Sequence, residues 1–298
     1  MSGIAAYQHT LAAPAILAGV GLHTGERVVL TLKPAPADAG VVFVRTDVRD
    51  LDNRVAVSPD AVVKTQLGTV IANAHGVTVS TIEHLMAAFA ALDVDNVVVE
   101  LDGPEVPIMD GSSLPFVKLI DRAGRRPQPA LRRYIEILSA VEVIDGDKRA
   151  ALLPDDGFVV DFEIAFRSEA IGRQRVVVDV TEAGFRTELA DCRTFGFVQE
   201  VDALRAIGLA RGGTMLNAVV IDGDRVLNPE GLRRSDEFVR HKALDAIGDL
   251  YVLGAPLIGR FEGVLAGHTL NNAVVRALIA RPDAWAYRAF VPQYAATA

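Results

Sequence analysis

The chain repeats one succession of elements, and this duplication limits its fold more than any other feature of the sequence. Val28–Arg45 and Arg149–Phe166 each consist of an apolar strand, a turn rich in Pro, Asp and Gly, and a second strand. Both stretches therefore predict a β-hairpin. A helix with a central histidine, His84 or His241, follows each of them. The pattern predicts one β/α unit that is used twice.

Each predicted unit combines antiparallel strands with helices, so the expected fold class is α+β, with two layers per unit. We expect the first unit over residues 1–127 and the second over residues 128–298, divided within the linker-like sequence RRPQPALRR. The second unit contains an additional segment at about residues 193–228. Its pattern predicts a strand or loop, a short helix near residues 199–207 and a strand near residues 218–221, which is a β-α-β insert.

Composition excludes several classes of protein and site. The 298 residues carry a formal net charge of −8, which argues against a general nucleic-acid binder, because such proteins need an extended basic surface. Cys192 is the single cysteine, so an intrachain disulfide and a cysteine-rich zinc site are excluded. We expect neither a signal peptide nor a membrane-spanning segment, and hence a cytoplasmic protein without stable membrane insertion.

The adjacent pair Glu83-His84 in STIEHLMAAFAAL has two interpretations. Ser80 and Glu83 have the spacing of a capping box, and His84 would then be an ordinary, partly buried histidine. Alternatively, His84 binds a metal ion and Glu83 is the base beside it. A zinc motif on one helix has a second histidine four residues after the first, where this chain has Ala88. Any other ligands must therefore come from elsewhere in the chain.

The helix predicted over Ser235–Leu253, with its serine as the cap, supplies candidates for those ligands. His241, Asp245 and Asp249 follow one another at intervals of four residues and therefore share one face. This stripe is either a solvated polar face or one side of a site. With His84 on the other side, two histidines, an aspartate and a water molecule would form an open catalytic zinc site.

Two further motifs also have a structural and a functional interpretation. In GHTLNN, His268 stands at an expected helix start, where it either joins a loose cap or acts as an acid–base histidine oriented by Asp249. In CRTFGF, Thr194 lies between an arginine and a phenylalanine, which alone indicates an ordinary strand end. Glu83 and His268 together would provide the separate base and acid that amide hydrolysis requires.

Six motifs together resemble the UDP-3-O-acyl-N-acetylglucosamine deacetylases of lipid A synthesis, a zinc-dependent family. They are GVGLHTG, STIEHL, PEVPIMDGSS, CRTFGF, DEFVRHKALDAIGDL and AGHTLNN, and the match runs from about residue 8 to about residue 290. The resemblance implies two α+β units whose helices pack between two sheets. It also implies hydrolysis of the N-acetyl group of UDP-3-O-(3-hydroxyacyl)-N-acetylglucosamine, an early committed step of lipid A biosynthesis.

The resemblance implies a role for each candidate residue. The metal ligands, for one Zn²⁺ per chain, are His84, His241 and Asp245. The catalytic residues are Glu83 as general base, His268 as general acid, Asp249 as its orienting carboxylate and Thr194 as stabiliser of the oxyanion. The substrate contacts are Phe195 on the sugar and Lys242 on the nucleotide phosphates. An apolar passage for the acyl chain is implied in the insert, with Leu22 at its mouth and a wall of Val198, Val201, Leu204, Ala210, Gly213 and Val220.

Two alternative functions remain open at the level of sequence. The same chemistry on another N-acyl substrate would keep every residue in its role. A non-catalytic module that holds an acylated sugar nucleotide would have no use for both Glu83 and His268, and a structural zinc ion prefers four closed ligands. We therefore expect an enzyme whose partner is the acylated UDP-sugar, which binds no nucleic acid and which is a monomer.

Overall fold

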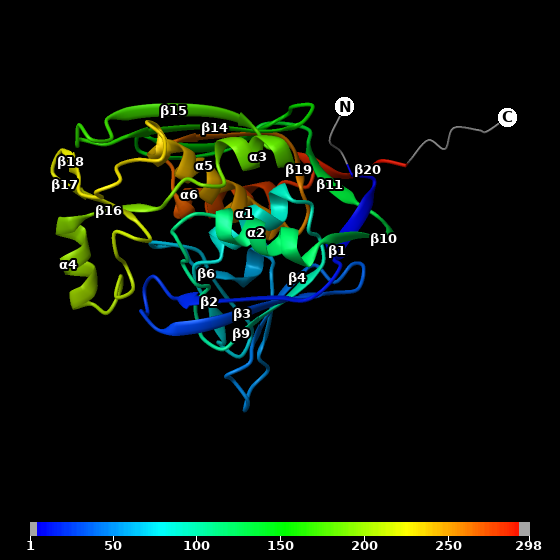
Figure 1. Ribbon diagram of the computed structural model, residues 1–298. Coiled ribbons are helices and arrows are strands. Elements are labelled where there is room, and N and C mark those ends of the chain that lie inside the picture. Colours follow the sequence, from blue (N-terminus) through cyan, green and yellow to red (C-terminus); the bar gives the residue numbers. More distant parts are fainter. Residues whose placement is uncertain (1–4, 292–298) are drawn as a thin grey trace.

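The computed structural model describes residues 5–291, and four of its helices form a layer between two β-sheets (Figure 1). The first sheet contains, in spatial order, β2 (Ala15–Val20), β3 (Arg27–Pro34), β9 (Val97–Leu101), β4 (Val41–Arg45) and β5 (Arg54–Ala56). The second contains β12 (Val141–Asp145), β13 (Lys148–Leu153), β19 (Leu257–Val264), β14 (Phe158–Ala165) and β15 (Arg173–Asp179). In the second sheet β11 (Arg133–Ile137) also pairs with the start of β19, and β20 (Trp285–Ala289) pairs with β11. The shared order of five strands confirms the predicted α+β class with two similar units.

The strand pairing predicted for the two hairpins is wrong. β3 and β4 do not pair with each other, because β9 lies between them, antiparallel to β3 and parallel to β4. In the second unit β19 separates β13 from β14 in the same way. The turn residues correctly predict that the chain reverses between the two strands. They do not predict the pairing, because each strand pairs with β9 or β19, and these strands follow a helix later in the chain. The central strand carries a fully buried face, with Val97, Val99 and Leu101, and this burial selects the central position.

Four helices form the layer between the sheets: α1 (Glu83–Ala91), α2 (Leu114–Ala123), α5 (Glu237–Leu250) and α6 (His268–Ile279). α1 and α5 pack against each other at the centre of this layer. Nearly every residue of these two helices is buried. Because both helices are buried on all sides, their motif residues are also core residues. For the same reason no single apolar stripe identifies either helix in the sequence.

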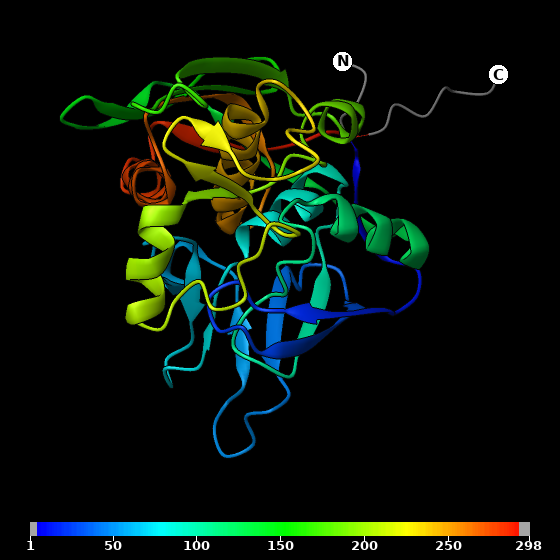
Figure 2. The same cartoon turned by 60° about the vertical axis from the view of Figure 1, so that its left-hand side comes forward.

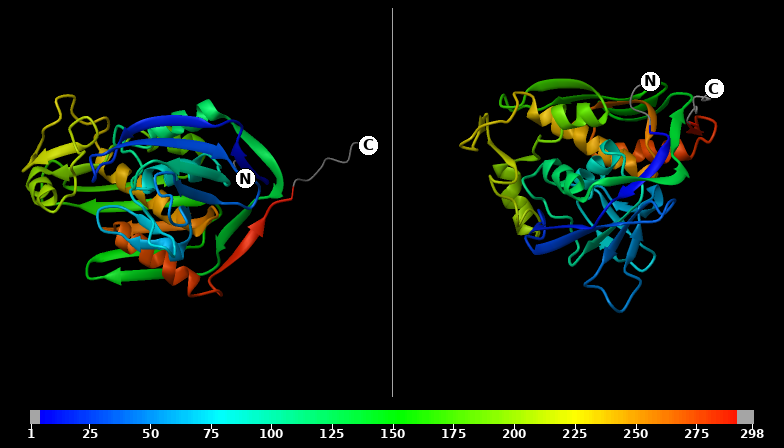
Figure 3. Two further views of the ribbon diagram at one scale, coloured as in Figure 1. Left: turned by 90° about the horizontal axis from the view of Figure 1, so that it is seen from below. Right: turned by 45° about the vertical axis from the view of Figure 1, so that its right-hand side comes forward.

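The predicted β-α-β insert is confirmed. β16 (Phe195–Phe197), α4 (Val198–Ala206) and β17 (Val219–Asp222) follow one another, and β16 and β17 pair in parallel. β18 (Arg225–Val226) completes this small sheet. Figures 1 and 3 show the insert at one end of the molecule, opposite the end that holds β20, and Figure 2 shows the molecule with the insert turned toward the viewer.

The stretch expected to be a linker is instead part of a sheet. β10 (Arg125–Leu131) pairs with β1 (Tyr7–Leu11), and β11 follows almost directly. Pro127 and Pro129 are tolerated because β10 belongs to a two-stranded sheet, where a missing N–H interrupts no central ladder. The remaining elements are β6 (Val62–Lys64), β7 (Val70–Ala72), β8 (Thr78–Val79), α3 (Glu182–Glu188) and the 3₁₀ turns Pro59–Ala61 and Tyr251–Leu253. Within residues 5–291, no helix is long and apolar enough to cross a membrane.

The side-chain caps expected for α1 and α5 are also wrong. α1 begins at Glu83, and Ser80 instead donates its hydroxyl proton to the carbonyl oxygen of Pro104 at 3.0 Å. The cap residue of α5 is Asp236 rather than Ser235, and the Asp236 side chain makes no capping hydrogen bond. Glu83 therefore has no capping role, so the capping-box interpretation of the Glu83-His84 pair is wrong.

Candidate metal and catalytic site

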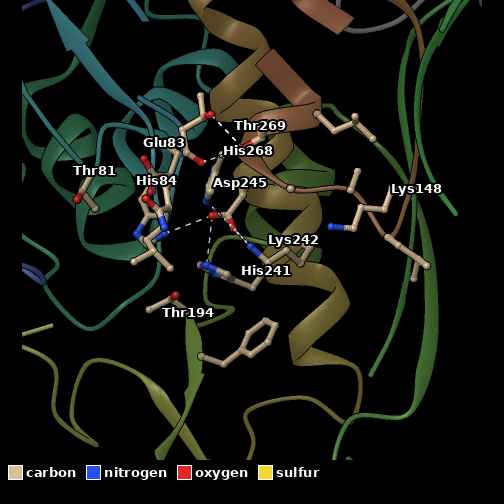
Figure 4. A pocket seen from close by; sticks show the side chains of 18 of the residues that line it. Thr81, Glu83, His84, Lys148, Thr194, His241, Lys242, Asp245, His268 and Thr269 are labelled. Atoms are coloured by element: carbon tan, nitrogen blue, oxygen red, sulfur yellow. Dashed lines mark hydrogen bonds and ion pairs between the residues drawn. The ribbon is translucent and has the colours of Figure 1, made fainter. Parts of the chain in front are cut away.

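The crossing of α1 and α5 brings the two halves of the candidate site together (Figure 4). Gly248 lies at this crossing, and a Cβ atom there would be only 1.9 Å from the carbonyl oxygen of Glu83. Only a residue without a side chain lets the start of α1 approach α5 this closely. As a result Glu83 and His84 face His241 and Asp245, which lie one turn apart on α5.

Three buried side chains converge on one point of this site. Asp245 Oδ1 lies 3.2 Å from His241 Nε2 and 3.4 Å from His84 Nε2. The three candidate ligand atoms all lie within 4.8 Å of one another. Asp245 Oδ1 is buried and accepts no hydrogen bond within the described residues, so its lone pairs are available to a cation. Two imidazoles and one carboxylate are the donor set of an open catalytic zinc site.

Neighbouring groups set the protonation of these candidate ligands. The carbonyl oxygen of Cys192 lies 3.0 Å from His241 Nδ1, so Nδ1 carries a proton and Nε2 is the ring nitrogen that faces Asp245. Lys242 Nζ donates a hydrogen bond to Asp245 Oδ2 at 2.7 Å. Burial opposes the ionisation of Asp245, but His241 and Lys242 outweigh it and hold the pKa of this carboxyl well below its usual range. The aspartate is therefore ionised, as a metal ligand must be.

Glu83 lies beside the candidate ligands without belonging to the cluster. It is only 3% exposed, and its Oε2 accepts a hydrogen bond from the backbone N–H of Thr69 at 3.0 Å. Burial raises the pKa of Glu83 above its ordinary value; the charge of His268 opposes this shift, and the charge of Asp249 adds to it. A carboxylate with a raised pKa is well suited to accept a proton near neutral pH.

His268 and Asp249 form a hydrogen-bonded pair at the start of α6. His268 is the first residue of that helix, as predicted, and its Nδ1 donates to Asp249 Oδ2 at 2.8 Å. Asn271 Nδ2 and Thr69 Oγ1 donate to the same carboxylate at 2.9 and 2.6 Å. Burial alone would lower the pKa of His268, but the Asp249 carboxylate reverses this and raises the pKa to about 9. The imidazole is therefore protonated at neutral pH, and its Nε2 lies 3.9 Å from Asp245 Oδ2.

A cavity of about 520 Å³ is bordered by the three candidate ligands, Glu83 and His268. Lys242 and Phe195 line its wall, and Lys242 Nζ lies 5.9 Å from the centre of the Phe195 ring. Thr194 lies on the same wall, near the ring of His241 (Figure 4). The cavity thus combines an apolar ring, a cation and a hydroxyl around the convergent ligands.

A second cavity of about 480 Å³ adjoins the first and extends into the insert. Leu22, Leu67, Thr194 and Phe195 line both cavities. The residues predicted for an acyl passage all border the second cavity, namely Leu22, Val198, Val201, Leu204, Ala210, Gly213 and Val220. The residues predicted to bind metal or substrate or to take part in catalysis therefore border one of the two cavities, except Asp249, which lies behind His268.

Three residues of this site went unassigned in the sequence. Thr69 follows Gly68 in a loop without periodicity, so no sequence pattern marks it. Asn271 lies in the GHTLNN motif, where only its polarity on an otherwise apolar helix face could have singled it out. Gly248 did have a signal, because glycine inside a predicted helix often marks a close approach of another backbone.

Comparison with known proteins places these features in one family. The family model described as UDP-3-O-acyl N-acetylglycosamine deacetylase matches residues 8–280. A protein of Phenylobacterium zucineum named UDP-3-O-acyl-N-acetylglucosamine deacetylase is 72% identical over 289 residues, covering 97% of this chain and 99% of the relative. Proteins of the same name from Acidithiobacillus ferrooxidans (51% identity; 90% of this chain, 88% of the relative) and Shewanella loihica (49%; 94% and 92%) are also similar. The chain therefore belongs to the UDP-3-O-acyl N-acetylglycosamine deacetylase family.

Proposed function

We propose that the chain is a zinc-dependent deacetylase that hydrolyses the N-acetyl group of UDP-3-O-(3-hydroxyacyl)-N-acetylglucosamine. The products are the free amine and acetate, and the reaction is an early committed step of lipid A biosynthesis. The observation that carries this proposal is the convergence of three buried candidate ligands with Glu83 and the His268–Asp249 pair around one cavity. The names of the relatives support the substrate.

His84, His241 and Asp245 are proposed to hold one Zn²⁺ per chain. Their donor atoms fit the ion, because two imidazole nitrogens face a buried carboxylate oxygen that accepts no hydrogen bond from the described residues. When bound, zinc polarises an amide oxygen and lowers the pKa of an attacking water toward ~7. A third ligand that is an aspartate leaves the site less positive than three neutral histidines would.

Glu83 and His268 are proposed to move the two protons of the reaction. Glu83 accepts a proton from the attacking water as the water oxygen bonds to the acetyl carbon. His268 gives the proton on Nε2 to the sugar nitrogen as the C–N bond breaks, because an amine leaves readily only when it is protonated. Asp249 holds the Nδ1 side of the ring, and this bond directs Nε2 toward the cavity.

Thr194, Phe195 and Lys242 are proposed to position the substrate. The Thr194 hydroxyl stabilises the oxyanion that forms from the amide oxygen, and loss of one such donor typically costs roughly 10²–10³ in turnover. Phe195 contacts the sugar ring, while Lys242 attracts the nucleotide phosphates. The acyl chain enters the second cavity past Leu22, which lines both cavities.

The two units are proposed to divide between residues 127 and 128. Residues 1–127 then supply Glu83 and His84, and residues 128–298 supply His241, Asp245 and His268. A cytoplasmic monomer is proposed, because one chain supplies every group that the reaction needs and the substrate is a UDP-sugar.

Acetate release from the acylated sugar nucleotide tests this function. The purified protein should release acetate and leave a free amine, a chelator should stop the reaction, and added zinc should restore it. Binding of the substrate by the zinc-loaded protein without acetate release would instead indicate a binding module. Release of acetate from simple N-acetyl compounds at the same rate would indicate a different N-acyl substrate.

A further inference from the structure

Thr69 makes a hydrogen bond to each of two carboxylates that the proposed reaction uses. Its backbone N–H donates to Glu83 Oε2 at 3.0 Å, and its hydroxyl donates to Asp249 Oδ1 at 2.6 Å. Its carbonyl oxygen accepts from the N–H of Ile82, directly before α1, at 3.5 Å. Thr69 is 3% exposed, so no bulk water competes for these contacts.

The loop that carries Thr69 is fitted closely to the site. Leu67 has a φ of 65°, which a branched side chain rarely adopts. Its carbonyl oxygen is hydrogen-bonded to His23 Nε2 at 3.2 Å. A Cβ atom at Gly68 would lie 2.9 Å from Glu83 Oε1, whereas Thr69 N–H donates to the other oxygen, Oε2. Two successive residues of this loop therefore lie close to the two oxygens of the Glu83 carboxylate.

We propose that Thr69 is a positioning residue that fixes the general base, Glu83, relative to the His268–Asp249 pair. Glu83 lies on α1 of the first unit, whereas Asp249 lies on α5 of the second. Among the described residues, Thr69 donates a hydrogen bond to both of these carboxylates. This inference deepens the proposed deacetylase function and rests on it.

The positioning follows from the geometry of the chain Glu83–Thr69–Asp249–His268. Asp249 Oδ2 already accepts from His268 and Asn271, so the Thr69 hydroxyl is the donor that fixes the other oxygen. Without it the carboxylate can rotate about its last torsion, and the imidazole bonded to it turns as well. The Nε2 atom of His268 then loses its alignment with the sugar nitrogen, while the three candidate metal ligands keep their places.

Removal of the hydroxyl tests this role directly. Thr69→Val keeps the shape of the side chain and should lower kcat about 10- to 100-fold, the usual range for a residue behind a catalytic group. KM and zinc content should stay within about two-fold, because neither the ligands nor the cavity wall changes. Thr69→Ser restores the donor and should recover most of kcat. If Thr69→Val does not accumulate as folded protein, Thr69→Ala repeats the deletion without added bulk.

Thr10 offers a matched control. Its hydroxyl is also fully buried and donates at 2.6 Å, but to the carbonyl oxygen of Asn96, away from both cavities. Thr10→Val should lower the melting temperature while leaving kcat per zinc-loaded molecule unchanged. Equal losses of kcat in Thr69→Val and Thr10→Val would reduce Thr69 to an ordinary buried threonine and overturn the proposal.

A double-mutant cycle shows whether Thr69 acts through Asp249. In an Asp249→Ala background, Thr69→Val should lower kcat by less than about two-fold further, because interacting residues are not additive. Independent, multiplying losses would contradict the proposed route and would overturn the inference.

An NMR measurement separates this inference from the proposed function. The Nδ1 proton of His268, assigned by its loss in His268→Ala, should shift in zinc-loaded Thr69→Val and return in Thr69→Ser. Thr10→Val should leave it unchanged. This resonance reports the position of the imidazole whether or not the wild-type protein releases acetate. Absence of acetate release would contradict the proposed deacetylase function but not the positioning role of Thr69. An unshifted resonance in Thr69→Val would overturn the role of Thr69 whatever the substrate is.

Discussion

Asp245 divides its two carboxylate oxygens between different partners. Oδ2 accepts a hydrogen bond from Lys242, whereas Oδ1 faces His84 and His241 and accepts no hydrogen bond from residues 5–291. The buried charge is thus kept ionised on one side and left open on the other. This arrangement is expected where a cation completes the site, because a buried anion with an unsatisfied oxygen is otherwise costly.

Loss of any one candidate ligand should remove the metal. His84→Ala, His241→Ala and Asp245→Ala should each reduce zinc well below one per chain, since three protein ligands and a water molecule leave no spare donor. Elemental analysis of the purified variants checks this. A variant that keeps both full zinc and normal activity would show that its residue is wrongly assigned.

Loss of the base should leave the metal in place. Glu83→Ala should keep about one zinc per chain and lose most turnover, because the proposed role of Glu83 is to move a proton and not to bind the metal. Zinc content and kcat are measured on the same preparation. If the variant loses only stability, with a normal rate per folded molecule, then Glu83 is a structural residue.

The pH dependence follows from the two raised pKa values. In the proposed mechanism Glu83 acts deprotonated, so kcat/KM should fall below its pKa, which burial raises above the ordinary value. In the same mechanism His268 acts protonated, so kcat/KM should fall above its pKa, which the Asp249 charge raises to about 9 against the effect of burial. Asp249→Asn removes that charge, and the alkaline limb of the bell should move to lower pH. An alkaline limb that stays in place in this variant would exclude the His268–Asp249 pair as its origin.

At the scale of elements, the contact between α1 and α5 decides whether the site exists. Gly248→Ala places a Cβ atom within 1.9 Å of the carbonyl oxygen of Glu83. The start of α1 must then move, so the variant should lose zinc although Gly248 is no ligand. The free energy of unfolding should fall by about 1–3 kcal/mol, the usual cost of overpacking.

A second glycine provides the control for that prediction. A Cβ atom at Gly157 would meet no atom within 4 Å, so Gly157→Ala should leave zinc content and activity unchanged. Zinc content in Gly248→Ala equal to that of the control would show that the helix crossing tolerates separation.

The insert should act on the acyl chain and not on the chemistry. A Cβ atom at Gly213 would lie 3.6 Å from Leu22 Cδ1, so the side chain of Gly213→Trp should fill the passage. Each CH₂ group kept out of the passage forfeits up to about 0.8 kcal/mol. The ratio of kcat/KM for long-acyl substrate to that for an analogue without the chain should therefore fall sharply. Leu216→Trp, at a position 87% exposed, is the control; equal losses on both substrates in Gly213→Trp would place the passage elsewhere.

The elements differ in how far their sequence predicts them. The insert is predicted well because its helix and strands are short and close together in the sequence, and because Gly212 and Gly213 mark the break between α4 and β17. Strand pairing is not, because β9 and β19 arrive after a helix and then enter between strands that looked like hairpins. Ser80 has the spacing of a cap, yet its hydroxyl bonds to Pro104, a contact distant in sequence. Local patterns cannot report such non-local partners.

At the scale of the whole molecule, the duplication explains where the site lies. Each unit contributes one sheet and helices to the central layer, and the site forms where α1 of one unit crosses α5 of the other. His84, His241 and His268 could be identified from the sequence as candidate site residues, because each stands in a specific motif. Thr69 could not, since its proposed role depends on hydrogen bonds to two carboxylates that are distant in sequence.

One zinc ion, held between the two units, is proposed to make this chain a deacetylase. A titration of the metal-free protein with zinc, with acetate release from the acylated sugar nucleotide measured at each step, checks this proposal. We expect no release before zinc is added, then a linear rise, and a plateau at one zinc per chain. Full acetate release by the metal-free protein, or a plateau at two ions per chain, would show that one zinc ion is not what the reaction requires.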